Sequence, residues 1–84
     1  MNKLEIGSSL RFKEGKTKYQ LTIIGIIEEP FTYLKMIDKN TKQIYYYEWG
    51  LGFVDEKEYD VNKEKILTEK EKLILKLIYL NNVI

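Results

Sequence analysis

Two residue types that carry much of protein chemistry are missing from this chain of 84 residues, which has no cysteine and no histidine. Without cysteine the chain forms no disulfides and offers no thiolate to a metal or a substrate, and without histidine it has no imidazole for acid–base catalysis. A catalytic site would need paired carboxylates such as Glu48 and Asp55 in a cleft, which a chain this short seldom forms. We therefore expect no enzymatic activity, no cofactor and no metal site.

An excess of charge of one sign is also lacking. Lysine and arginine number 14 against 13 aspartate and glutamate residues, a net charge of +1, so the whole molecule has no field that draws in nucleic acid or an anionic membrane. Only Arg11 is an arginine, and arginine is the side chain best suited to base edges. The cations around the first predicted turn are Arg11, Lys13, Lys16 and Lys18. We interpret them as a solvated rim that discourages edge-to-edge pairing, with contact to phosphates as the alternative.

Long apolar runs are absent as well. No segment approaches the roughly 20 apolar residues of a membrane-spanning helix, and the opening sequence MNKLEIGSS lacks the apolar stretch of a secretory signal. We expect a cytoplasmic protein without a membrane partner. Lysine, isoleucine, asparagine and tyrosine are abundant and alanine is absent, which indicates A+T-rich codons and hence a low-GC bacterium or one of its phages or mobile elements.

What the chain does contain is typical of one globular domain spanning residues 1–84. It is 44% hydrophobic and 32% charged, a composition well away from that of disordered chains. Apolar and polar residues alternate over short stretches that are separated by turn residues, as they do in strands. The predicted strands lie on both sides of Gly7 within residues 4–14, and at 17–27, 31–37, 42–49 and 58–61. Gly25, inside the second long segment, indicates a bulge or a bend.

The pattern changes near the end of the chain. Thr68 followed by Glu71 forms a capping box, and the residues after Thr68 are helix formers, so a helix is predicted at 67–81. Five or six strands in residues 1–62 and one C-terminal helix predict an α+β, mainly β fold: a small, strongly bent antiparallel sheet or SH3-like barrel, with an open α+β sheet as the alternative. The pattern identifies no specific family.

The sequence QIYYYEWG, residues 43–50, places three tyrosines beside the only tryptophan. Alternate side chains of a strand share a face, and a four-residue loop at 38–41 predicts a hairpin register with Tyr33 opposite Tyr46. The face that makes the better core carries Leu34, Met36, Tyr45, Tyr47 and Trp49. The other face carries Tyr33, Lys35, Lys42, Ile44, Tyr46 and Glu48. A three-residue loop would exchange the two faces.

The second of these faces is a candidate binding surface. Exposed tyrosines beside lysines are typical of a protein-binding patch, and also of a platform on which single-stranded nucleic acid stacks. The candidate nucleic-acid-binding residues are Tyr33, Lys35, Lys39, Lys42 and Tyr46. The simpler interpretation is that Tyr33 and Tyr46 form an ordinary cross-strand pair on a solvated sheet face.

The predicted helix has more apolar residues than one packed face needs. At 100° per residue, one wide arc takes in most of them: Leu73, Ile74, Leu77, Ile78, Leu80 and Ile84. Leu75 and Tyr79 fall outside that arc. They are candidates for contact with another chain, and the alternative is that they lie under the loop from residue 55 to 65.

We therefore expect a non-enzymatic protein-binding module, an accessory or inhibitor protein of a phage or mobile element that occupies a partner's surface. Its predicted anchors are Tyr33, Tyr46, Leu75 and Tyr79, and its partner is another protein or a second copy of itself. The alternative is a binder of single-stranded RNA or DNA.

Overall fold

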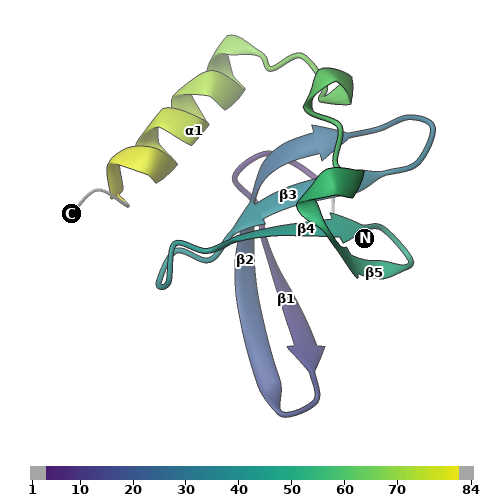
Figure 1. Cartoon of the computed structure of the whole chain (residues 1–84). Helices are drawn as coiled ribbons and strands as arrows, with labels where there is room; N and C mark the ends of the chain where they lie inside the picture. The colour runs from purple at the N-terminus through teal and green to yellow at the C-terminus, as the bar shows by residue number, and fades with distance from the viewer. Residues whose placement is uncertain (1–3, 82–84) are drawn as a thin grey trace.

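The computed structural model describes residues 4–81, without the side chain of Asn81. The strands are β1 (Ser9–Glu14), β2 (Thr17–Ile27), β3 (Tyr33–Ile37), β4 (Ile44–Glu48) and β5 (Gly52–Val54), and they are followed by helix α1 (Glu69–Asn81). The strands form one antiparallel sheet in the order β1-β2-β3-β4-β5. The sheet curls into a half-barrel with one C-terminal helix (Figure 1), so the predicted α+β, SH3-like fold class is confirmed.

Two predicted strands are not formed. The chain around Leu4 and Ile6 is a turn that leads into β1, and the predicted closing strand at 58–61 is replaced by two short 3₁₀ helices, Glu56–Glu58 and Val61–Lys63. Both segments still deliver apolar side chains to the interior, because Ile6 and Tyr59 are buried.

The half-barrel bends along β2, which belongs to both of its halves. The first part of β2 pairs with β1, from Thr17 opposite Glu14 to Thr22 opposite Ser9. The second part pairs with β3, and the register shifts between Ile23 and Gly25. This irregularity is the bend that Gly25 predicts. The β1–β2 hairpin consequently projects away from α1 and from the other three strands (Figure 1).

The core fills the inside of the curled sheet. Its buried members are Ile6, Leu10, Leu21, Ile23, Ile26, Leu34 and Met36. Each such side chain contributes about 1.5–3 kcal/mol relative to an exposed one. A smaller cluster is formed by Ile24, Ile37 and Ile78, and Ile74 and Leu75 of α1 contact both clusters. Successive residues such as Ile23 and Ile24 therefore serve two cores, as the alternation of a strand requires.

The β3–β4 hairpin has a longer connection than the predicted loop. Asp38 Oδ1 accepts hydrogen bonds from the backbone N–H groups of Asn40 (2.9 Å) and Thr41 (3.3 Å), and Lys42 has a φ of +65°. Ile37 therefore pairs with Ile44, and Tyr33 lies opposite Glu48.

The predicted register was thus wrong by two residues. A shift of two keeps every side chain on its face, so Tyr45 and Tyr47 still share the face of Leu34 and Met36.

After β5 the chain returns to the sheet through residues 64 and 65. Lys65 N–H donates to Ile26 O (2.9 Å), and Glu64 forms an isolated bridge with Ile27. The Tyr59 hydroxyl donates to Glu64 Oε2 (2.7 Å) beside Gly25. Burial and the Glu64 carboxylate raise the pKa of Tyr59, so its hydroxyl stays protonated and this hydrogen bond persists at neutral pH.

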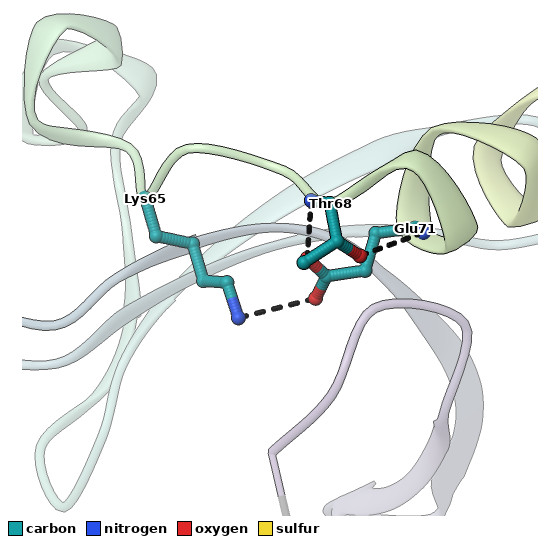
Figure 2. A network of polar contacts seen from close by, with 3 residues as sticks. All are labelled: Lys65, Thr68 and Glu71. Atoms are coloured by element: carbon teal, nitrogen blue, oxygen red, sulfur yellow. Dashed lines mark hydrogen bonds and ion pairs between the residues drawn. The ribbon is translucent and has the colours of Figure 1, made fainter.

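The capping box at the start of α1 is confirmed. Glu71 Oε1 accepts from Thr68 N–H (2.9 Å), and Thr68 Oγ1 accepts from Glu71 N–H (3.2 Å). Lys65 Nζ lies 3.1 Å from Glu71 Oε2, on the side away from the helix (Figure 2). The hydrogen bond from Thr68 and the charge of Lys65 lower the pKa of Glu71. The helix begins at Glu69, two residues after the predicted start.

The inward face of α1 differs from the predicted arc. Ile78 is buried, and Ile74 and Leu75 are half-buried against both core clusters. Three leucines assigned to the interior are instead exposed, namely Leu73 (58%), Leu77 (53%) and Leu80 (54%), and Ile84 lies outside the described residues. The prediction for these leucines was wrong because α1 crosses the sheet on a narrow contact.

Among residues 4–81, no helix is long and apolar enough to cross a membrane.

Candidate functional site

More than half of the chain's aromatic residues gather at the mouth of the half-barrel. They come from four strands and the turn after β4. Four of them pack directly against the buried core on the concave side of the sheet. We call this group the aromatic face, and its members are Phe12, Tyr19, Tyr45, Tyr47, Trp49 and Phe53. None of the six is fully buried.

Three rings at the centre of the aromatic face join the two edges of the sheet. The Phe12 ring centroid lies 4.9 Å from that of Tyr47 and 5.3 Å from that of Phe53. The centroids of Tyr47 and Phe53 are 5.2 Å apart, in an edge-to-face arrangement. Because β1 and β5 stand at opposite ends of the strand order, the half-barrel is closed here by ring contacts and not by backbone hydrogen bonds.

Trp49 forms the outer end of the aromatic face. Its ring packs edge-on against Tyr47 at 6.1 Å, and 49% of the residue is exposed. The sequence placed Trp49 in the core, which was wrong because Gly50, with a φ of +90°, turns the chain directly after it. Phe53 is likewise 38% exposed. Large apolar rings left open to solvent beside one another mark a surface that gains free energy when another molecule covers it.

The end of the aromatic face near the β3–β4 loop carries hydroxyl groups. The centroids of Tyr19 and Tyr45 are 5.7 Å apart, and the Tyr45 hydroxyl donates to Gln43 Oε1 (3.3 Å). Partial burial, Tyr19 and Asp38 together raise the pKa of Tyr45. Tyr45 therefore stays neutral at physiological pH and adds a polar tip to an otherwise apolar surface.

A groove runs along one side of the aromatic face. It has a volume of about 560 Å³, with residues 9–12 of β1 on one wall and the rings of Tyr47 and Trp49 on the other. A second hollow of about 380 Å³ lies around Arg11 and Lys18, next to Asp38 in the β3–β4 loop. Arg11 and Phe12 line both, so this part of β1 borders the two largest hollows described.

The predicted residues Tyr33 and Tyr46 lie on the opposite side of the sheet, and they are not cross-strand partners. Tyr33 is opposite Glu48, and partial burial together with Glu48 and Glu58 raises its pKa. The Tyr46 ring packs on that of Tyr59 at 5.1 Å. Each tyrosine therefore has a partner within the fold, and both are half-buried.

The predicted lysines are divided between two places. Lys35 lies opposite Tyr46 in the β3–β4 ladder, whereas Lys39 and Lys42 belong to the loop that joins these strands. The structure thus brings one lysine, Lys35, beside a predicted tyrosine. The carboxylates of Glu48 and Glu58, and not lysines, neighbour Tyr33.

Leu75 and Tyr79 lie together in a hollow of about 190 Å³ that Glu64, Lys65 and Leu67 also line. Leu75 packs against both core clusters, and Tyr79 is 48% exposed. Of the loop from residue 55 to 65, Glu64 and Lys65 border this hollow, while Tyr79 stays open to solvent. Their role in binding a partner stays a prediction.

Phe12, Tyr19 and Phe53 were not predicted as members of a candidate site. A usable signal was present for the first two, because a tight turn at Gly15 pairs them across the β1–β2 hairpin. Nothing local connects Phe53 with Phe12.

Within residues 4–81, no group of three or more acidic side chains is arranged to hold a metal ion.

The chain matches no family model, no curated protein and no solved structure. The aromatic face and the groove beside it are therefore interpreted from their own residues.

Proposed function

We propose that this protein is a binding module that recognises another protein through the aromatic face. The observation that carries the proposal is the set of six neighbouring rings of which none is fully buried, with Trp49 and Phe53 the most exposed. Aromatic side chains dominate the centres of protein interfaces, because they bury a large area while few torsion angles are fixed.

The arrangement of the rings favours a protein partner over stacked bases. Neighbouring rings of the aromatic face meet at interplanar angles of 48–79°, so many ring faces are already covered by ring edges. A stacking platform for single-stranded nucleic acid needs ring faces that are open to the bases. A protein surface makes no such demand, since its apolar side chains pack against edges and faces alike.

Binding of single-stranded nucleic acid is the second candidate function, and one observation favours it. The cations Arg11 and Lys18 stand beside Phe12 and Tyr19, and positive charge next to aromatic rings is the general pattern of single-strand binders. This candidate predicts affinity for labelled oligonucleotides that falls steeply with salt. An absence of binding at low salt would remove it.

Site-specific photo-crosslinking tests the main proposal. Benzoylphenylalanine placed at Trp49 or Phe53, in cells that produce the protein, should give one recurrent protein adduct by mass spectrometry. The same probe at Ile66, which is 93% exposed but outside the aromatic face, is the matched control. Equal crosslinking at Ile66 and Trp49, or adducts with nucleic acid only, would overturn the proposal.

The narrower form of the proposal is an inhibitor from a phage or mobile element that acts in the bacterial cytoplasm. It rests on the small size of the chain and on its composition. Expression of the identified partner with the wild-type protein and with Trp49→Ala would show whether occupation of the aromatic face blocks the partner's activity.

A further inference from the structure

The groove beside the aromatic face has an open strand edge as one wall. β1 stands at one end of the sheet and pairs only with β2. Ile23 N–H donates to Ser8 O (2.9 Å), and residues along an antiparallel ladder alternate between bonding the partner strand and facing away from it. Ser9, Arg11 and Lys13 therefore turn their backbone N–H and C=O groups outward. An edge with these free groups is a template for another strand.

The opposite wall of the groove lies where β4 turns into β5. β5 spans only Gly52–Val54 and pairs with Tyr46, Tyr47 and Glu48. Trp49 lies beyond the end of this pairing. The volume of about 560 Å³ is comparable to that of ligand sites in proteins, roughly 300–1,000 Å³. An added strand would lay alternate side chains on Phe12, Tyr47 and Trp49.

The other side of the same hairpin is cationic. Lys13 lies directly opposite Lys18, a pairing of like charges that destabilises the isolated hairpin. Arg11, Lys13, Lys16 and Lys18 are accompanied by a single carboxylate within the hairpin, that of Glu14. Among the ion pairs of residues 4–81, none involves these four cations. Charge complementarity therefore favours an acidic partner.

We propose that β1 binds an extended acidic segment of the partner protein as an added strand. This inference rests on the proposed function and names the chemistry of the partner. Residues of the segment that bond to Arg11 place their side chains on the cationic side, next to Arg11 and Lys13, because cross-strand partners share a face. The residues between them point to Phe12, Tyr47 and Trp49. The expected motif alternates acidic with apolar residues.

A strand of polypeptide fits this edge better than a strand of nucleic acid. The outward N–H and C=O groups of Ser9 and Arg11 supply donors and acceptors in turn, and only another peptide backbone matches both along its length. Nucleic acid would use the cations and leave these groups unpaired.

The first experiment uses the full chain and two fluorescein-labelled peptides. One alternates glutamate with leucine, and the other alternates lysine with leucine. We expect fluorescence anisotropy to show binding of the glutamate peptide, weakened about tenfold or more by Arg11→Gln and by added salt. Trp49 emission should shift to shorter wavelength as the peptide covers the ring. Equal binding of the two peptides would overturn the proposal.

The second experiment separates strand addition from other contacts. In the proposed register the glutamates bond to β1, so N-methylation of the glutamate nitrogens removes the ladder and preserves the charge. N-methylation of the leucines, whose N–H groups face solvent, is the matched control. We expect the first modification to weaken binding about tenfold or more and the second to leave it almost unchanged.

Three other outcomes separate a failure of strand addition from a failure of the proposed function. Binding that ignores both N-methylations but is lost with Trp49→Ala would overturn strand addition and leave the aromatic face as a protein-binding site. Binding of a labelled oligothymidylate in place of either peptide would overturn both. A dimer in light scattering that Arg11→Gln does not disrupt, but that Lys13→Pro does, would overturn the acidic partner, because β1 would then pair with a second copy.

Discussion

The rings of Phe12 and Phe53 meet with their centroids 5.3 Å apart, across an opening between β1 and β5 that has no backbone pairing. In a barrel closed by hydrogen bonds, the separation of the edge strands is fixed at about 4.8 Å. Here the separation depends on the size of two side chains. The aromatic face is therefore both the closure of the half-barrel and a partly exposed apolar surface.

This relationship predicts a moderate stability cost for Phe53→Ala. Phe53 is 38% exposed and contacts Phe12 and Tyr47, so its removal should lower the free energy of unfolding by about 1–2 kcal/mol. Urea denaturation followed by the fluorescence of Trp49 measures this. Leu51→Ala is the control, since Leu51 is 79% exposed and should change stability by less than about 0.5 kcal/mol. Equal losses of unfolding free energy for Phe53→Ala and Leu51→Ala would show that the contact of Phe53 with Phe12 does not stabilise the half-barrel.

The capping box predicts a stability that depends on pH in a defined direction. The pKa of Glu71 is below its ordinary value of 4.5 because Thr68 and Lys65 favour the carboxylate. A lowered pKa in the folded state stabilises the protein above the unfolded pKa, and this contribution is lost as the pH falls through the folded pKa.

Glu71→Gln isolates that contribution, because glutamine still accepts from Thr68 N–H but carries no charge. The wild type should be the more stable of the two at about pH 6, and the difference should shrink as the pH falls below the ordinary pKa of 4.5. Glu69→Gln, at an exposed pair with Lys72, is the control and should show a much smaller pH effect. A difference independent of pH would contradict the assigned role of the charge.

The orientation of α1 predicts opposite results for two leucines of the helix. Leu75 packs against both core clusters, whereas Leu77 is 53% exposed. Leu75→Ala should lower the free energy of unfolding by about 2 kcal/mol, and Leu77→Ala by less than about 0.5 kcal/mol. Both substitutions keep helix propensity high, so thermal denaturation compares packing alone. A larger loss of stability for Leu77→Ala than for Leu75→Ala would mean that α1 packs through the face predicted from the sequence.

The approach of Tyr59 and Glu64 to Gly25 predicts that a methyl group is not tolerated there. A Cβ at position 25 would lie 2.7 Å from the Tyr59 hydroxyl and also against the Glu64 carboxylate. Gly25→Ala should therefore cost about 2 kcal/mol or more. Chemical denaturation of Gly25→Ala, Glu64→Ala and the double variant gives the coupling. Additive effects would show that the two residues do not meet.

Features that depend on neighbouring residues were predicted correctly from the sequence. Thr68 and Glu71 satisfy each other's backbone groups within one helical turn, and Gly25 marks the irregularity in β2 that curls the sheet. Both are local effects, for which residue type and spacing contain most of the information. The sheet has its strands in chain order, because short connections favour pairing of consecutive strands.

Features that depend on three-dimensional approach were not predicted. The β3–β4 register was missed because the Asp38 side chain and the positive φ of Lys42 extend the loop by two residues. The inward face of α1 was missed because it depends on the angle at which the helix crosses the sheet. The aromatic face was missed because curling of the sheet, and not sequence proximity, brings Phe53 against Phe12.

β2 extends beyond the end of β3, so the β1–β2 hairpin leaves the body of the molecule as a two-stranded ribbon (Figure 1). The rings of Phe12 and Tyr19 hold this ribbon against Tyr47 and Tyr45, and its lysines lie beyond these rings at the far end. In the proposed complex, these lysines would meet the acidic segment before Tyr47 and Trp49 do. Ionic strength should therefore govern how fast the complex forms, while the rings govern how long it lasts.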